Sequence, residues 1–340
     1  MKFIGKQAVY LMALLVLAAC SSQPTVSTGQ IQTQVAHSLA ETQAAYTSTP
    51  TSTNTPVPTN SPKPPTPTPI PTSTLGVGST QVSEKDGMVL VYVPEGNFTM
   101  GASVDQAMVV CKLYKNNCQR GWFTDEEPAH TVYLDTYWID QTEVTNKMYA
   151  LCVSSGKCSP PKSSESSTRK NYYGNPEYDN FPVIYVSWDD ASAYCAWADS
   201  RLPTEAEWEK AASWDEINQV KYTYPWGNTT NDCSLSNFPD GSKYCVGDTT
   251  AVDNYPNGKS PYGALDMIGN VWEYVADWFG DRYYWTLPDG VHNPTGPSSG
   301  EYHAVRGGEW GANSYTHTAD RDFDEDGAAN FLGIRCARSP

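Results

Sequence analysis

The sequence predicts an α+β fold with little regular secondary structure, long ordered loops and several disulfides. Three observations predict it. Two strand-like runs and three short helix patterns stand out in residues 81–340. The rest of this region is rich in Gly, Asn, Asp and aromatic residues, which is typical of ordered loops rather than of repeated βαβ units. Eight cysteines lie in the same region, an even number that indicates disulfides in an exported protein.

The charge of the chain excludes one class of partner. The 340 residues include 22 basic and 38 acidic ones, for a net charge of −16. Residues 1–80 contain three lysines and one glutamate, so residues 81–340 carry 19 basic and 37 acidic residues, a net charge of −18. A nucleic-acid binder needs a basic face to neutralise phosphates. We therefore expect no nucleic-acid partner.

Residues 1–20 have the features of a signal peptide. Lys2 and Lys6 precede the apolar run Tyr10–Ala19, which is too short to span a bilayer permanently. The run ends in Leu-Ala-Ala-Cys20 and resembles the bacterial lipobox, in which the cysteine is lipidated and becomes the mature N-terminus. An ordinary secretory signal followed by a chance cysteine is the alternative. We expect Cys20 to anchor an exported lipoprotein to the membrane at the bacterial cell surface, without spanning it.

Residues 21–80 are dominated by Thr, Ser, Pro and Gln, and Pro50–Pro71 alternates proline with threonine or serine. Such a segment cannot bury a core and favours extended polyproline II. It is either a disordered stalk that lifts the domain off the membrane or a leader with no spacing role.

The domain at 81–340 shows its elements in order. Capping residues mark two of the helices: Ser187 precedes an apolar helix pattern, and Thr204 with Glu207 forms a capping box. The β-rich runs are dominated by branched and aromatic residues. The predicted elements are strands within 87–94 and 131–139, and helices within 142–153, from 187 onward, and from 204 to about 212.

The cysteines of the domain suggest local pairs. None shows the two close Cys-x-x-Cys knuckles of a structural zinc site. Four cysteines allow three pairings and eight allow 105, so the assignment stays open at this point. Proximity in sequence favours the pairs Cys111–Cys118, Cys152–Cys158 and Cys233–Cys245, and these leave Cys195 with Cys336.

Nine short motifs occur in one order across nearly all of residues 87–340. They are Val93-Pro94-Glu95-Gly96 with Met100-Gly101, Glu127-Pro128-Ala129-His130, Glu143-Val144-Thr145-Asn146, Pro182-Val183 with Val186-Ser187-Trp188, 201–209 (RLPTEAEWE), Pro225-Trp226-Gly227-Asn228, Gly269-Asn270-Val271-Trp272-Glu273, Arg306-Gly307-Gly308 and Gly333-Ile334-Arg335-Cys336. With these motifs the domain resembles the formylglycine-generating enzyme (sulfatase-modifying factor) family. The resemblance implies a C-type-lectin-like α+β fold and a bridge between Cys195 and Cys336.

The resemblance also implies chemistry that this sequence lacks. The family oxidase binds copper through two cysteines, one just after a Gly-Gly-x-aromatic turn and one five residues later. Residues 307–317 contain no cysteine, and Cu(I) needs soft thiolate ligands. We therefore expect no copper and no catalytic residue of that type. An iron site built from His303, His317 and an aspartate is an unusual alternative, and an oxidoreductase with displaced ligands is the competing function.

The resemblance implies structural calcium in two places. In the first, the side chains of Asp266 and Glu273 and the carbonyls of Gly269 and Val271 would supply the hard oxygen ligands that calcium needs. The alternative is that Glu273 only pairs with an arginine. The second site would use Asn237, the carbonyl of Phe238, and Asp248, in a loop whose alignment to the family is loose.

The region 311–331 lies where the family places its active surface. It is rich in Asn, Ser, Tyr, Thr, His, Asp, Ala and Phe. Tyr, Ser, Gly and Asn are also the residues that adaptable binding loops use, and only Glu325 in the region cannot come from an NNC codon. That composition resembles the variable proteins of diversity-generating retroelements. We expect a peptide, protein or glycan ligand; a purely structural envelope protein is a further alternative. The expected binding surface consists of Glu309, Trp310, Ala312, Asn313, Tyr315, His317, Asp320, Asp322, Phe323 and Asp324.

Overall fold

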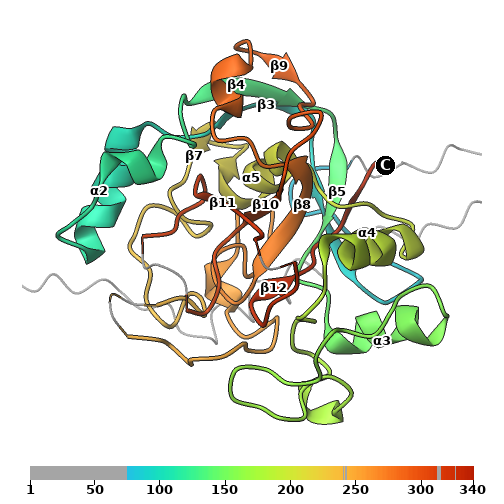
Figure 1. Cartoon of the computed structure of the whole chain (residues 1–340). Coiled ribbons are helices and arrows are strands. Elements are labelled where there is room, and N and C mark those ends of the chain that lie inside the picture. Colours follow the sequence, from blue (N-terminus) through green and yellow to red (C-terminus); the bar gives the residue numbers. More distant parts are fainter. Residues whose placement is uncertain (1–74, 240, 242, 312–314, 326) are drawn as a thin grey trace, which may run out of the picture. The chain divides into compact units, whose positions relative to one another are not determined.

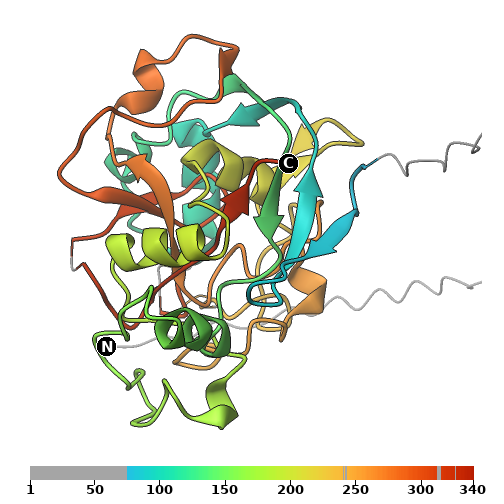
Figure 2. The same cartoon turned by 90° about the vertical axis from the view of Figure 1, so that its right-hand side faces the viewer.

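The structure is a computed structural model that describes residues 75–340 except 240, 242, 312–314 and 326. The first sheet joins the two ends of the domain in the antiparallel order β1-β2-β5-β13. In Figure 2 the red C-terminal strand lies beside the green β5, which lies beside the strands at the start of the domain. Its strands are β1 Thr80–Val82, β2 Val89–Val93, β5 Tyr137–Asp140 and β13 Ala337–Arg338. The strand predicted within 87–94 is confirmed as β2.

The second sheet has the order β11-β10-β8-β12 and lies near the centre of the domain (Figure 1). Strand β8 pairs antiparallel with β10 and parallel with β12. The sequence-based prediction contains no strand here, although 271–278 is rich in branched and aromatic residues, as strands are. The strands are β8 Trp272–Trp278, β10 His303–Arg306, β11 Arg321–Phe323 and β12 Leu332–Gly333.

The third sheet has the order β3-β4-β9, and a two-stranded ribbon pairs β6 with β7. The single β-rich run predicted at 131–139 is two strands in different sheets, because the chain leaves β4 at Leu134 and enters β5 at Tyr137. The strands are β3 Gly96–Met100, β4 His130–Leu134, β9 Val291–His292, β6 Trp214–Asp215 and β7 Val220–Lys221.

All three predicted helices are present, and each starts at a residue whose side chain accepts an N–H of the first turn. Thr145 caps α3, and the capping boxes of Ser187 with Asp190 and of Thr204 with Glu207 open α4 and α5. Such caps satisfy backbone donors that the helix itself leaves unpaired. The helices are α3 Asn146–Ser154, α4 Trp188–Trp197 and α5 Glu205–Ser213.

Helix α2, Val104–Tyr114, was not predicted. Ser103 and Gln106 form a capping box at its start, a signal that the sequence carries. Four short 3-10 helices complete the described elements: η1 Arg120–Phe123, η2 Pro176–Tyr178, η3 Pro256–Gly258 and η4 Tyr283–Thr286. None of the helices in the described part of the chain is long and apolar enough to cross a membrane.

Helix α5 is the centre of the largest hydrophobic cluster. Every residue of α5 is buried, and the helix contacts β3 and β4 of the third sheet as well as β8 and β10 of the second. Trp208 is fully buried in this cluster. Burying such a side chain contributes about 1.5–3 kcal/mol or more, so α5 fixes how these two sheets are arranged around the site.

Four disulfides connect the eight cysteines of the domain. Cys195–Cys336, implied by the resemblance, is confirmed and joins α4 to the end of the domain. The three local pairs favoured by proximity are also present: Cys111–Cys118, Cys152–Cys158 and Cys233–Cys245. Each thiol of residues 81–340 is therefore committed to a disulfide.

Several predictions fall on residues outside the described ones. These are the signal peptide at 1–20 with Cys20, most of the segment 21–80, and Ala312 and Asn313 of the expected binding surface. The described chain already forms a turn at Gly76–Ser79 and enters β1 at Thr80, so regular structure begins slightly before residue 81.

Candidate functional site

The loop between β10 and β11 is held against α5 by buried ion pairs. Arg306 Nη2 lies 2.7 Å from Glu209 Oε2 and donates to the Thr318 carbonyl at 2.7 Å. Arg321 forms a two-point pair with Glu205. Removing one partner of a buried pair leaves the other charge uncompensated, so these contacts fix both ends of the loop.

A two-glycine turn starts this loop. Gly307 and Gly308 have φ values of +96° and +74°, and a Cβ on Gly308 would lie 3.0 Å from Cγ2 of Thr316. Both the backbone conformation and the close approach require glycine here. The turn sets the direction in which Glu309 leaves β10.

Beside the loop lies an open cavity of about 610 Å³. Its wall combines segments far apart in sequence: the η1 region, the stretch from β8 to η4, and the loop that leads into β11. Half of the expected binding surface lies in this wall: Glu309, Tyr315, Asp320, Asp322 and Phe323.

A second cavity of about 390 Å³ adjoins the first and contains Asp324 in its wall. The two cavities share four lining residues, which we call the junction: Trp272, Glu309, Asp322 and Phe323. The junction therefore combines two carboxylates with two aromatic rings between two concave spaces.

Two other residues of the expected surface lie elsewhere. The Trp310 ring packs edge-on against Tyr244 at 6.1 Å and lines neither cavity. His317 Nε2 lies 3.0 Å from the Glu126 carboxylate and contributes to a separate cavity of about 340 Å³. The loop therefore places Trp310 and His317 away from the other described residues of the expected surface.

The carboxyl groups of the first cavity have perturbed acidities. Burial raises the pKa of Asp125, Glu309 and Asp320 to about 7 each, and for Asp320 the nearby Glu126 adds to the effect. Burial also raises the pKa of Asp322. Desolvation disfavours the charged form of a carboxyl, so this wall holds negative charge at an energetic cost.

Aromatic rings form the remainder of the wall. Trp122 stacks on Tyr315 with centroids 5.9 Å apart, and Phe279 and Phe323 are in contact at 4.8 Å. Trp122, Asp125, Phe279 and Asp281 were not among the predicted site residues. No local pattern marks them, because only the folding of η1 and the β8–η4 stretch brings them to the loop.

The first predicted calcium site is partly assembled. Asp266 is buried, and neither of its carboxylate oxygens has a hydrogen-bond partner among the described residues. Glu143 Oε2 is likewise buried without a partner among the described residues. Burial raises the pKa of both carboxyl groups well above their ordinary range, and for Glu143 the nearby Asp266 adds to the effect. A buried carboxylate without a partner is costly, so the residues around Asp266 fit a hard cation.

Glu273 has a different environment from Asp266. Its oxygens accept from Arg335 Nη2 at 2.6 Å and Nε at 2.7 Å, and from Trp208 Nε1 at 2.6 Å. The arginine pairing considered as an alternative is therefore present. No group of three or more His, Cys, Asp or Glu side chains able to hold a metal occurs within the described residues. Calcium here would depend on Asp266 and on the carbonyls of Gly269 and Val271.

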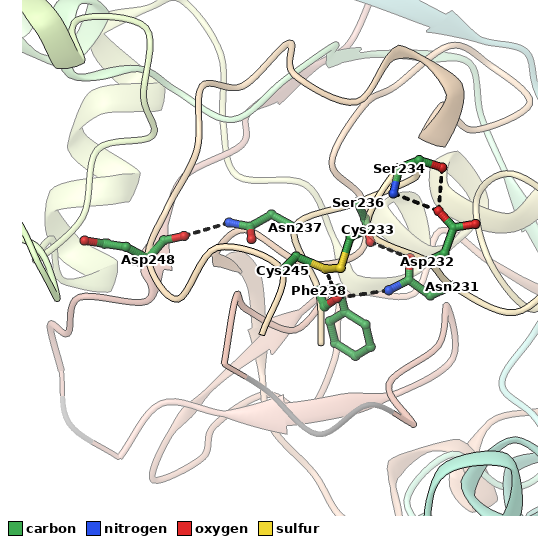
Figure 3. Close-up of a disulfide and its surroundings, with 9 residues drawn as sticks. All are labelled: Asn231, Asp232, Cys233, Ser234, Ser236, Asn237, Phe238, Cys245 and Asp248. Carbon is green, nitrogen blue, oxygen red and sulfur yellow. Dashed lines mark hydrogen bonds between the residues drawn. A yellow bond between two sulfur atoms is a disulfide. The ribbon is translucent and has the colours of Figure 1, made fainter. Parts of the chain in front are cut away.

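The second predicted calcium site is not brought together. Figure 3 shows the Asn237 amide donating to the backbone carbonyl of Asp248, whose carboxylate points away from Asn237. That carboxylate accepts from Thr168 and pairs with Arg169 at 2.9 Å. The Phe238 carbonyl accepts from Asn231. A guanidinium already neutralises the one acid that this site requires.

The histidines considered for iron occupy separate environments. His303 stacks between Trp188 and Trp278, with centroids 3.8 Å apart on each side. His317 is paired with Glu126. The two imidazole rings therefore contact different sets of side chains.

Comparison with known proteins agrees with this architecture. The chain is 31% identical over 307 residues to the formylglycine-generating enzyme of Streptomyces coelicolor, covering 73% of this chain and 88% of that protein. It is also 34% identical over 235 residues to the serine/threonine-protein kinase pkn1 of Chlamydia caviae, covering 63% of this chain. The chain spans about a third, 35%, of the length of that relative.

One solved structure shares the fold at low identity. Treponema denticola variable protein 1 superposes with a TM-score of 0.54 at 21% identity, covering 78% of this chain and all of that one. The family model described as the sulfatase-modifying factor enzyme 1-like domain matches residues 76–340. The α+β fold predicted from the motifs is therefore confirmed, and the chain belongs to the sulfatase-modifying factor enzyme 1-like domain family.

Proposed function

We propose that this chain is an exported lipoprotein that displays its domain at the bacterial cell surface and binds a ligand through the cavity beside the β10–β11 loop. The signal-like residues 1–20, the cysteine at position 20 and the Pro/Thr-rich segment 21–80 support display. One observation carries the binding proposal: Glu309, Tyr315, Asp320, Asp322 and Phe323 line a single open cavity of about 610 Å³. Concave sites with aromatic walls and a few polar groups are where ligands bind.

A ligand array tests the binding proposal. The full chain is applied to peptides, proteins and glycans beside two variants that remove comparable rings. Trp122 lines the cavity and is 39% exposed, whereas Trp285 is 61% exposed and does not line it. We expect Trp122→Ala to weaken the strongest interaction about tenfold or more and Trp285→Ala to leave it unchanged. Equal loss in both variants, or no interaction at all, would contradict the proposal.

The membrane anchor has an independent test. Cys20→Ser removes the sulfur that lipidation requires while leaving the apolar run intact. We expect the unmodified chain to fractionate with membranes and to carry the mass of an acylated cysteine, and the variant to be lost from the membrane fraction. A variant that stays in the membrane fraction to the same extent would contradict the anchor.

Sequence diversification would suit such a binding surface. Residues 311–331 contain one residue, Glu325, that an NNC codon cannot encode, and a protein described as variable shares the fold. The proposal requires a reverse transcriptase gene and an imperfect repeat of the 3′ end near this gene. Sequencing of the locus decides it, because without both features the loop is an ordinary binding loop.

An oxidoreductase is the second candidate, favoured by the identity to a formylglycine-generating enzyme. Against it, residues 307–317 contain no cysteine, and the eight cysteines of the domain form disulfides. The test is metal analysis of the purified chain together with a peptide-cysteine oxidation assay. Stoichiometric copper or iron with peptide oxidation would favour the enzyme over the binding protein.

We also propose that calcium binds at Asp266 as a structural ion. Bound calcium would supply positive charge to a carboxylate that the chain leaves unpartnered. The ion would stabilise the turn that enters β8, which carries Trp272 into the cavity junction.

A further inference from the structure

The joined cavities have a one-sided charge. Among the residues that the structure describes, seven carboxylates line them: Asp125, Asp281, Glu309, Asp320, Asp322, Asp324 and Glu325. Among the described lining residues, Arg321 is the one that carries positive charge. Negative charge concentrated in a concave, partly desolvated site attracts cations more strongly than the same charges in water.

Arg321 is already saturated by the chain itself. Its Nε and Nη2 atoms bond to Glu205, and Nη1 donates to the carbonyls of Asp125 and Gly280 at 2.8 and 3.2 Å. The guanidinium also lies over the Tyr284 ring, 4.2 Å from its centroid. Arg321 therefore offers little to an anionic ligand. Its charge acts on Asp125, but its side-chain ion pair is with Glu205, which lines neither cavity.

Aromatic faces accompany these carboxylates. The junction contains Trp272 and Phe323 next to Glu309 and Asp322. At the edge of the first cavity, the Lys115 ammonium lies 4.8 Å from the Tyr315 ring centroid and 5.9 Å from that of Trp122. An aromatic pair of this wall thus already accepts one ammonium group from the chain. Rings and carboxylates together are the groups that recognise organic cations.

The buried carboxylate of Glu126, which lines neither cavity, adds negative charge close to the first one. Glu126 is 1% exposed, and its Oε1 has no hydrogen-bond partner in the described part of the chain. It raises the pKa of both Asp125 and Asp320, which line the first cavity. Its other oxygen, Oε2, lies 3.0 Å from His317 Nε2, the one cationic partner of Glu126 among the described residues.

We propose that the joined cavities bind an extended ligand bearing ammonium or guanidinium groups, with one such group held at the junction. This inference rests on the proposed binding function and names the ligand chemistry. Lysine or arginine side chains of a peptide and a free polyamine present the same chemistry. The combined cavities, about 610 and 390 Å³, have room for more than one cationic group, so a polycation should bind more tightly than a single amine.

Calorimetric titration of the full chain at pH 8 and low salt tests this proposal. The probes are tetralysine, spermidine and tetralysine acetylated on every side chain. We expect tetralysine to bind, the acetylated peptide to bind at least tenfold more weakly, and raised salt to weaken the charged interaction. Tighter binding of tetralysine than of spermidine identifies a peptide source; the reverse order identifies a polyamine.

Variants locate the interaction. Glu309→Gln and Asp322→Asn keep the shape of the junction and remove its charge, and each should weaken tetralysine binding roughly fivefold to tenfold. Glu165→Gln makes the same charge change at an exposed residue that lines neither cavity and should have no effect. Near-ultraviolet circular dichroism of each variant verifies that it is folded.

Three results would overturn the inference: no binding of either cation, equal binding of the acetylated peptide, or equal losses in Glu165→Gln and Glu309→Gln. These results are distinguishable from failure of the proposed function. If the array yields a neutral or acidic ligand that depends on Trp122, the binding function stands and the cationic ligand is wrong. If neither the array nor the titration detects a ligand, both are wrong.

Discussion

Arg321 and Glu205 form a two-point ion pair, with Nε 2.7 Å from Oε1 and Nη2 2.8 Å from Oε2. Glu205 is the first residue of α5 and is 1% exposed. It also lies 3.1 Å from Arg306 Nη1. One carboxylate at a helix N-terminus therefore connects the central helix to β10 and β11, and it pairs with Arg321, the cationic residue of the described cavity wall.

Replacing this carboxylate should destabilise the domain strongly. Glu205→Gln leaves two buried guanidinium groups with less compensating charge, and we expect a loss of about 3–5 kcal/mol in the free energy of unfolding. Urea denaturation measures it. Asp105→Asn, which breaks an exposed pair with Arg120, is the matched control and should shift the midpoint little. A similar midpoint for both variants would contradict the role assigned to Glu205.

Chelation should lower the thermal stability of the domain if calcium binds at Asp266. In EDTA, Asp266→Asn should be more stable than the unmodified chain by about 1–3 kcal/mol, because the substitution removes a buried, unpartnered charge. In calcium the difference in stability between the two proteins should become smaller or change sign, since asparagine is a weaker calcium ligand than aspartate. Calorimetric melting in both buffers measures this. If EDTA leaves the melting temperature of the unmodified chain unchanged, calcium does not bind.

The disulfides should differ in their contribution to stability. Cys195–Cys336 closes a loop with a sequence separation of 141, and Cys152–Cys158 one of 6. Loop-closure entropy gives about 5 kcal/mol for the long loop and about 2 kcal/mol for the short one. Paired Cys→Ser variants, compared by denaturation, should preserve this order. A larger loss from the short loop would show that local packing, not chain entropy, dominates.

The cavity carboxyls should make the unliganded chain less stable as pH rises. The pKa of Asp125, Glu309 and Asp320 is raised to about 7 in the folded state, so the folded chain binds more protons than the unfolded chain between about pH 4 and 7. His317, paired with Glu126, acts in the same direction because its pKa is raised. Arg321 stays charged throughout. Stability from these groups is therefore highest at the acidic end of the window and is lost through pH 7.

Glu309→Gln isolates one of these carboxyls. The free energy of unfolding should decrease from pH 5 to pH 8 in both proteins. We expect this decrease to be smaller in the variant than in the unmodified chain, by about 1–3 kcal/mol. Glu165→Gln is again the control, because its carboxylate is exposed. An identical pH dependence in all three proteins would mean that Glu309 is not held in a desolvated site. Binding sites commonly contain charged, desolvated groups that lower the stability of the folded chain.

Much of the fold was predictable because its signals are local. The caps at Ser187 and Thr204 and the β-rich run at 87–94 depend on neighbouring residues, and the structure has the elements they predict. The run at 131–139 was assigned to one strand because sequence cannot show that β4 and β5 belong to different sheets. Helix α2 was missed although Ser103 and Gln106 carry its capping box.

The site was predictable only in part. The loop residues Glu309, Tyr315 and Phe323 could be proposed from the family motifs, but their partners Trp122 and Phe279 come from segments with no local signal. Similarly, the motif at 266–273 indicated two calcium carboxylates, but a buried arginine 62 residues away in sequence from Glu273 neutralises one of them. Pairings between distant segments depend on the tertiary structure.

Amide hydrogen exchange tests most directly whether this cavity is the ligand site. The full chain is compared with and without the strongest ligand of the array. We predict slower exchange in residues 119–125 and 315–323, both of which contribute to the cavity wall, and unchanged exchange in α3 and α4. Protection confined to α3 and α4, with none in the cavity segments, would contradict it.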